Sequence, residues 1–106
     1  MRADFSVRSD LSGANPRGAN LNGSDLFRTN LSGADLTQAN LNRADLGESN
    51  LSFAKLRGGF MFRADLANSD LSSADLTGAD LTGADLRGAD LTDAILDPDA
   101  LADAIT

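Results

Sequence analysis

The chain repeats one pattern of apolar and polar residues every five positions. From Ser9 to Pro98 there are eighteen consecutive five-residue units with no insertion, and the third place of each unit is apolar. That place is Leu in sixteen units, with Pro16 and Met61 as the exceptions. The first place holds a small residue, the second is Asp or Asn in fifteen units, and the last two are mostly polar or Gly. An internal repeat this regular governs the whole fold.

A spacing of five excludes both an α-helix and a flat sheet. On an α-helix, successive leucines would step by about 140° and scatter around the cylinder. On a straight strand, an odd spacing would put successive leucines on opposite faces. The chain must therefore turn once per unit, so that each Leu points inward together with the small residue two places before it.

A longer period of 20 residues is superimposed on the period of five. Ser or Thr takes the first place at residues 9, 24, 29, 49 and 69, and four of these five lie 20 residues apart, while every twentieth residue from Ala14 to Ala94 is Ala. This predicts four units per coil, so that the eighteen units make about 4.5 coils. The predicted inward side chains include Leu11, Leu31, Leu36, Leu51, Leu56, Met61, Leu71, Leu76 and Leu91.

Tandem units of the form A(D/N)LXX resemble the pentapeptide-repeat family. The resemblance covers residues 9–98 and rests on all eighteen units. It implies an all-β solenoid, a right-handed quadrilateral parallel β-helix in which the central Leu and the preceding small residue stack inside. This agrees with the inference from spacing.

The two ends of the repeat differ. Residues 1–8 carry a unit that is one residue out of phase with Ser9, which predicts an irregular N-terminal partial coil. At the other end, Asp97 followed by Pro98 is typical of a helix start. We therefore expect a short capping helix over residues 99–106, with Leu101 and Ile105 against the last coil, as solenoids need such caps. The N-terminal end has no comparable lid, which favours an end-to-end homodimer through unpaired strand edges.

The second place of the unit carries most of the acidic residues. Short polar side chains there can accept hydrogen bonds from backbone N–H groups at the turns. One column would still stack carboxylates about 4.8 Å apart: Asp25, Asp45, Asp65 and Asp85. The glycines of calcium-binding β-roll repeats are missing, so no metal or cofactor is expected.

The composition excludes several kinds of catalytic and metal-binding site. Cys, His, Trp and Tyr are absent, which removes thiolate, imidazole and His/Cys metal chemistry. The net charge is −7, and residues 54–106 hold ten acidic and four basic residues. Such a charge disfavours direct binding to nucleic acid or to anionic membrane. With no apolar run long enough for a signal peptide or a membrane span, we expect a soluble, cytoplasmic protein.

Departures from the repeat concentrate between residues 53 and 63. Phe60 replaces the usual Asp or Asn and, with Phe62, flanks the inward Met61, so both rings should face outward. Phe53, Phe60, Phe62 and Arg63 form the predicted contact patch for a protein partner. The alternative is that the rings lie flat over the coils and cover the leucine backbones.

The sequence bears on three functional classes. The sequence favours a non-enzymatic scaffold or protein-interaction module whose partner is unknown. The alternative is a DNA mimic that binds DNA gyrase, as some longer members of the family do. An enzyme is disfavoured, because the aspartates lie on a regular surface without a pocket or a desolvated pair.

Overall fold

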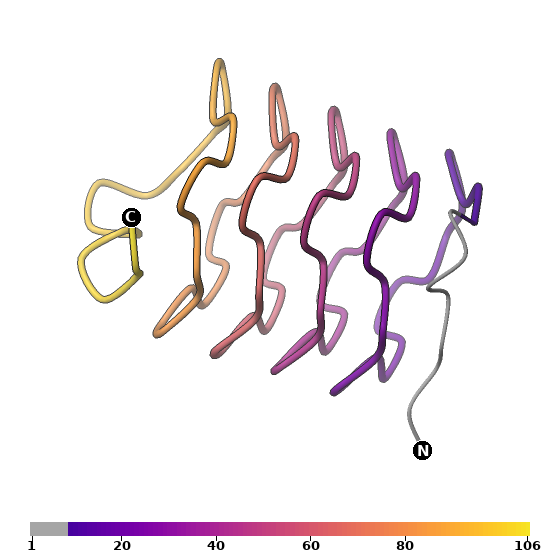
Figure 1. Ribbon diagram of the computed structural model, residues 1–106, viewed down its shortest axis with the longest axis horizontal. Coiled ribbons are helices and arrows are strands. Elements are labelled where there is room, and N and C mark those ends of the chain that lie inside the picture. Colours follow the sequence, from indigo (N-terminus) through magenta and orange to yellow (C-terminus); the bar gives the residue numbers. More distant parts are fainter. Residues whose placement is uncertain (1–8) are drawn as a thin grey trace.

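The coils stack along one axis. In this computed structural model, which describes residues 9–106, the chain winds through successive similar coils (Figure 1). Parallel backbone bridges join residues 20 apart, from Asp10 with Asn30 to Asp85 with Ile105. One coil therefore contains four five-residue units, which confirms the 20-residue period.

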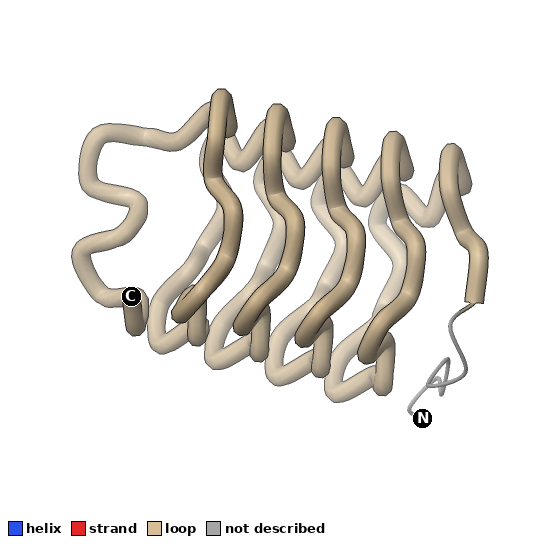
Figure 2. Tube along the Cα trace, turned by 45° about the horizontal axis from the view of Figure 1, so that its top comes forward, coloured by secondary structure: helices blue, strands red, loops and turns tan. Residues whose placement is uncertain are grey.

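Each coil has four sides joined by two-residue turns. We number the sides by the residues at their centres. Side 1 carries Leu11, Leu31, Leu51, Leu71 and Leu91; side 2 carries Pro16, Leu36, Leu56, Leu76 and Leu96; side 3 carries Leu21, Leu41, Met61 and Leu81; side 4 carries Leu26, Leu46, Leu66 and Leu86. Each side pairs with the same side of the neighbouring coils through a single bridged residue. Residues 9–106 therefore contain no helix and no strand of more than one residue (Figure 2).

The turns explain why the last place of the unit is so often Gly. The N–H three residues after each central Leu donates to the carbonyl of that Leu, as from Ala34 to Leu31 at 3.0 Å. The second turn residue has a positive φ, for example 67° at Gly33 and 59° at Phe53. A positive φ at this place is a feature of type II turns, and Gly adopts it without steric strain.

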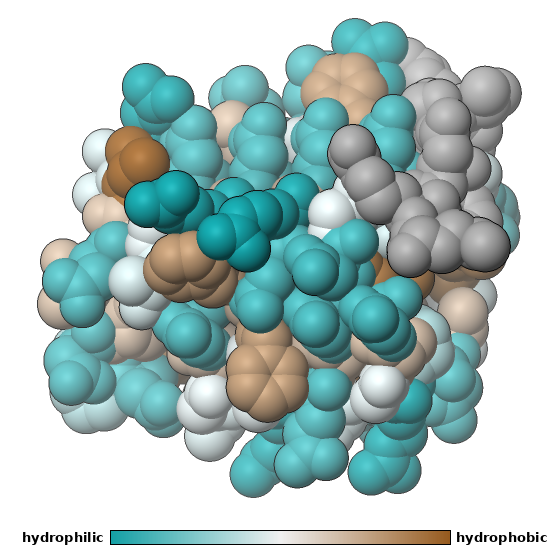
Figure 3. Space-filling model, turned by 90° about the horizontal axis from the view of Figure 1, so that it is seen from below, coloured by the Kyte–Doolittle hydropathy of each residue, from teal (hydrophilic) through white to brown (hydrophobic). Residues whose placement is uncertain are grey.

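The interior is a stack of leucines with small residues beside them. Leu36, Leu56 and Leu76 on side 2 are all fully buried, whereas the visible outer face is mostly hydrophilic (Figure 3). The structure buries Leu31, Leu51, Met61 and Leu71 in the same way, and leaves Leu11 and Leu91 half-buried near the ends. Burying each large side chain stabilises the fold by about 1.5 to 3 kcal/mol, so the ladder of leucines dominates stability.

Pro16 marks the N-terminal end of the stack. At most other central places the N–H donates to the neighbouring coil, as that of Leu21 does to the Asn40 carbonyl at 2.7 Å. Pro16 has no N–H, and no bridge joins Asn15 to Asp35 within the described part of the chain. The absent bond would face the following coil, but the two coils stay paired on this side, because the Asp35 N–H donates to the Ala14 carbonyl at 2.8 Å and the Gly18 N–H to the Thr37 carbonyl at 2.9 Å. The predicted partial coil of residues 1–8 lies outside the described residues.

The predicted capping helix is wrong. Residues 98–103 form consecutive turns, with N–H groups donating three residues back, from Ala100 to Asp97 and from Ala104 to Leu101. The chain then returns to the stack, where Ile105 pairs with Asp85. Leu101 packs on the core, but Ile105 is exposed. A segment too short for a stable helix therefore covers the C-terminal end by turns.

Candidate functional site

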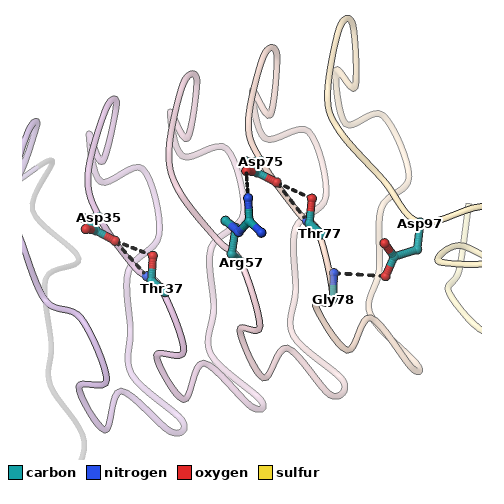
Figure 4. Close-up of polar contacts among 7 residues, drawn as sticks. All are labelled: Asp35, Thr37, Arg57, Asp75, Thr77, Gly78 and Asp97. Atoms are coloured by element: carbon teal, nitrogen blue, oxygen red, sulfur yellow. Dashed lines mark hydrogen bonds and ion pairs between the residues drawn. The ribbon is translucent and has the colours of Figure 1, made fainter.

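The Asp and Asn side chains at the second place hold the turns. The Oδ1 of Asp75 accepts the backbone N–H of Thr77 at 3.0 Å and its hydroxyl at 2.6 Å, and Asp35 holds Thr37 in the same way (Figure 4). The hydroxyl bonds lower the pKa of both carboxyls. Asp97 serves differently, because its Oδ2 accepts the N–H of Gly78 at 2.9 Å and anchors the C-terminal segment to the coil before it.

The acidic ladder stacks as the sequence predicts, but its carboxylates are engaged. Backbone bridges join Asp25 to Asp45, Asp45 to Asp65 and Asp65 to Asp85. Each Oδ1 accepts the N–H two residues later, at 3.0 to 3.3 Å. The Arg87 side chain also donates to both oxygens of Asp85, which with the backbone bond lowers the pKa of that carboxyl to about 2. Within residues 9–106, no cluster of acidic side chains is arranged to hold a metal ion.

The turn after Phe60 is held differently. Phe60 has no oxygen to accept the N–H of Phe62, and the Oδ1 of Asn42, one coil earlier, accepts that N–H at 2.8 Å. The substitution therefore removes a local bond and is compensated by a neighbouring coil. It also leaves the Phe60 ring on side 3, where its side chain is 50% exposed.

Two arginines stack on the Phe62 ring. The guanidinium carbons of Arg43 and Arg63 each lie 5.3 Å from the centre of that ring. Such contacts stabilise an exposed site by about 0.5 to 1 kcal/mol each. We call Arg43, Phe60, Phe62 and Arg63 the Phe–Arg cluster. The prediction from sequence omitted Arg43, although it lies 20 residues before Arg63 and therefore at the same place of the preceding coil.

Phe53 does not belong to this cluster. It lies in the turn after side 1, whereas Phe60 lies on side 3, and all of side 2 with its turn at residues 57–58 comes between them. The patch predicted from sequence is corrected in this respect, because residues near in sequence are separated by a corner of the coil. Phe27 lies apart from the cluster, and its ring lies against the next coil, where a Cβ on Gly47 would be 3.2 Å from its Cδ1.

The N-terminal end of the stack is hollowed. An apolar cavity of about 330 Å³ opens there, lined by Leu11, Ala14, Asn15, Pro16, Leu21, Leu26 and Leu31. Its lining is apolar apart from Asn15. The end-to-end homodimer expected at this end stays a prediction.

A family model for pentapeptide repeats matches the sequence with eight copies, over residues 7–26, 24–61 and 61–97. The chain belongs to the pentapeptide-repeat family. No curated protein matches it. None of the residues from 9 to 106 forms a helix long and apolar enough to span a membrane.

Solved structures of other pentapeptide-repeat proteins share the fold. Rfr23 of the cyanobacterium Cyanothece 51142 is 29% identical, with a TM-score of 0.87 over 98% of this chain and 81% of Rfr23. A protein of the Arabidopsis thaliana thylakoid lumen is 30% identical, with a TM-score of 0.73 over 94% of this chain and 69% of its own. The protein alr5209 of Nostoc Pcc 7120 is 34% identical, with a TM-score of 0.62 over 98% and 84%. These relatives imply a right-handed quadrilateral β-helix.

Proposed function

We propose that this protein is a non-enzymatic interaction module that binds a protein partner through the Phe–Arg cluster. The observation that carries the proposal is the exposed Phe60 ring beside Phe62, at places where the following coil has Asp80 and Thr82. Exposed aromatic residues and arginines are the side chains most enriched in the energetic centres of protein interfaces.

The rigid stack supports a binding role. Every coil is fixed to its neighbours by backbone bonds, such as those from Phe60 N–H to the Ala39 carbonyl at 3.0 Å and from Met61 N–H to the Asp80 carbonyl at 2.9 Å. A surface carried on such a scaffold loses little conformational entropy when it binds.

DNA mimicry toward gyrase has less support. Duplex DNA presents a charge about every 1.7 Å, whereas the whole chain carries only −7. The ladder of four aspartates on side 4 is bordered by arginines at the turns on both of its edges: Arg43 and Arg63 on one, and Arg28 and Arg87 on the other. QnrB1, a plasmid-mediated fluoroquinolone resistance protein, shares only the fold at 17% identity. We expect no effect of excess protein on supercoiling by gyrase.

Affinity capture from a lysate of the source organism tests the proposal. We expect the wild-type protein to retain a partner that F60D/F62T loses, since this variant carries the residues that the next coil has at the same places. The matched control is Phe53→Ser, which removes an exposed ring at a different corner and should keep the partner. A partner that F60D/F62T still retains, or no partner above its background, would contradict the proposal.

A further inference from the structure

We propose that the Phe–Arg cluster binds an acidic peptide segment of its partner, in which carboxylates accept hydrogen bonds from Arg43 and Arg63 and an apolar side chain packs on Phe60. This deepens the proposed function and rests on it. The new element is the chemistry of the partner, which the charges and contacts around the cluster indicate.

Arg43 and Arg63 differ from the other arginines of residues 9–106 in their ion pairs. Residues 9–106 contain six arginines, and four of them have a carboxylate oxygen within 4.0 Å: Arg17, Arg28, Arg57 and Arg87. Within the same range, neither Arg43 nor Arg63 forms an ion pair. The chain has sixteen acidic and nine basic residues, so an arginine without a carboxylate runs against its composition.

Among residues 9–106, the carboxylates nearest in sequence to these arginines hold turns and do not pair with them. Asp45 and Asp65 each follow an arginine of the cluster by two residues. Their Oδ1 atoms accept the N–H groups of Gly47 and Ala67, both at 3.0 Å, and so hold the next turn. Within residues 9–106, no carboxylate oxygen lies within 4.0 Å of a side-chain nitrogen of Arg43 or Arg63, so both guanidinium groups are available to a carboxylate from outside.

The Phe62 ring prepares both guanidinium groups for binding. The two arginines come from successive coils, which lie about 4.8 Å apart, and both contact one ring. Stacking restricts the long side chains before a ligand arrives and so reduces the entropy lost on binding. A stacked guanidinium keeps its planar set of N–H donors, which matches a carboxylate in a two-bond arrangement.

The cluster also offers an apolar contact. Phe60 is 50% exposed and lies two residues before Phe62. An interface of this kind combines an aromatic anchor with charged groups at its edge. Nucleic acid is disfavoured, because a long polyanion would also meet the acidic remainder of a chain with net charge −7.

A fluorescence anisotropy titration with a synthetic peptide tests the inference. The probe is a labelled peptide of alternating glutamate and serine around one central phenylalanine, and its analogue has glutamine in place of each glutamate. We expect the wild-type protein to bind the acidic probe at least about tenfold more tightly than the analogue, with affinity falling as salt rises. R43Q/R63Q should weaken binding of the acidic probe by at least about tenfold.

The matched control is R17Q/R57Q, which removes two paired arginines from the turns after side 2 and gives the same net charge. It should change the affinity less than twofold. An equal loss in R17Q/R57Q, or no preference for the acidic probe over its analogue, would overturn the inference. So would equal competition by a single-stranded oligonucleotide, or a dimer of the wild-type protein that R43Q/R63Q abolishes, because the occupant would then be nucleic acid or a second copy.

The inference and the proposed function fail in different ways. A captured partner that F60D/F62T loses and R43Q/R63Q retains would leave the proposed function standing and reject the acidic peptide. If the peptide titration gives the expected result but no captured protein depends on Phe60 and Phe62, the cluster binds carboxylates and the proposed function is rejected.

Discussion

Residues 49–68 and 69–88 form two neighbouring coils with matching interiors and different surfaces. Their central residues are all buried, from 0% exposed at Leu56 to 4% at Leu86. In the coil 69–88, all four second-place residues are Asp and each accepts the N–H two residues later. In the coil 49–68, Lys55 and Phe60 occupy two of these places and cannot do so.

The interior, which the two coils share, sets the winding of the chain. Despite the lost side-chain bonds, the N–H of Leu56 still donates to the Asp75 carbonyl at 2.8 Å, and Phe60 still bridges Asn40 and Asp80. The second place is therefore free to change where function requires it. The departures from the repeat in the coil 49–68 are surface changes on an unchanged stack.

The largest expected effect comes from breaking the shared interior. Leu56→Ala and Leu76→Ala remove fully buried side chains from side 2 of the two coils. Each should lower the free energy of unfolding by about 2 to 5 kcal/mol, because the lost contacts leave a cavity. Urea unfolding followed by circular dichroism measures both. The exposed neighbour variant Lys55→Ala should stay within about 0.5 kcal/mol, and a mild effect of Leu56→Ala beside a severe one of Leu76→Ala would show that the interiors differ.

The next largest effect should be a loss of stability in acid, which depends on the aspartates of the coil 69–88. Hydrogen bonds lower the pKa of Asp75, Asp80 and Asp85, that of Asp85 from 3.8 to about 2. A lowered pKa in the folded state means that these carboxylates stabilise the fold above pH 3.8 and lose that contribution as the pH falls toward about 2. The urea midpoint should therefore be flat from pH 7 to about 4 and fall below it.

Two exchanges between Asp and Asn check this assignment. D75N/D80N keeps oxygen acceptors for the turns but removes two titrating groups, so its urea midpoint should fall less steeply in acid. Asn50→Asp should do the opposite in the coil 49–68, because its oxygen accepts both the N–H and the hydroxyl of Ser52. Unchanged acid profiles in both variants would place the acid sensitivity elsewhere.

A smaller effect is expected at the substitute bond of the coil 49–68. Asn42→Ala leaves the N–H of Phe62 without its acceptor and should cost about 1 kcal/mol. Adding Phe60→Asp supplies an acceptor at the place where the next coil has Asp80, so the double variant N42A/F60D should regain most of that loss. Urea unfolding of both single variants and the double variant gives the coupling. Strictly additive effects would contradict the compensation.

The regular places of the repeat allowed most of the fold to be predicted from sequence. Leucines at every fifth place can point inward together only if the chain turns once per unit. The 20-residue spacing of Ser and Ala indicated four sides per coil. The end was harder. Asp97 and Pro98 have the residues of a helix start, but the carboxylate of Asp97 finds the Gly78 N–H one coil away. Local propensity was overridden by a contact that the sequence around Asp97 does not contain.

The candidate site could be predicted only in part. The unusual residues Phe60, Phe62 and Arg63 are visible in the sequence because they break the repeat. Arg43 occupies an ordinary polar place, and only the stacking of coils brings it to the Phe62 ring. Phe53 was grouped with the cluster because closeness in sequence was taken for closeness in space, although side 2 and the turn at residues 57–58 lie between Phe53 and Phe60.

The smallest expected effect concerns the exposed Phe53 itself. Its φ of 59° is a left-handed conformation that costs an L-residue roughly 1 to 2 kcal/mol, and its side chain is 69% exposed and contributes little packing. Phe53→Gly removes that strain but loosens the unfolded chain, so the net gain should be about 0.5 to 1 kcal/mol. Phe53→Ala keeps a Cβ and should give no gain. Ser73, at the same place of the next coil with φ of 58°, should gain as much on Ser73→Gly. A gain confined to Phe53 would instead assign the strain to the aromatic ring rather than to the corner that both coils share.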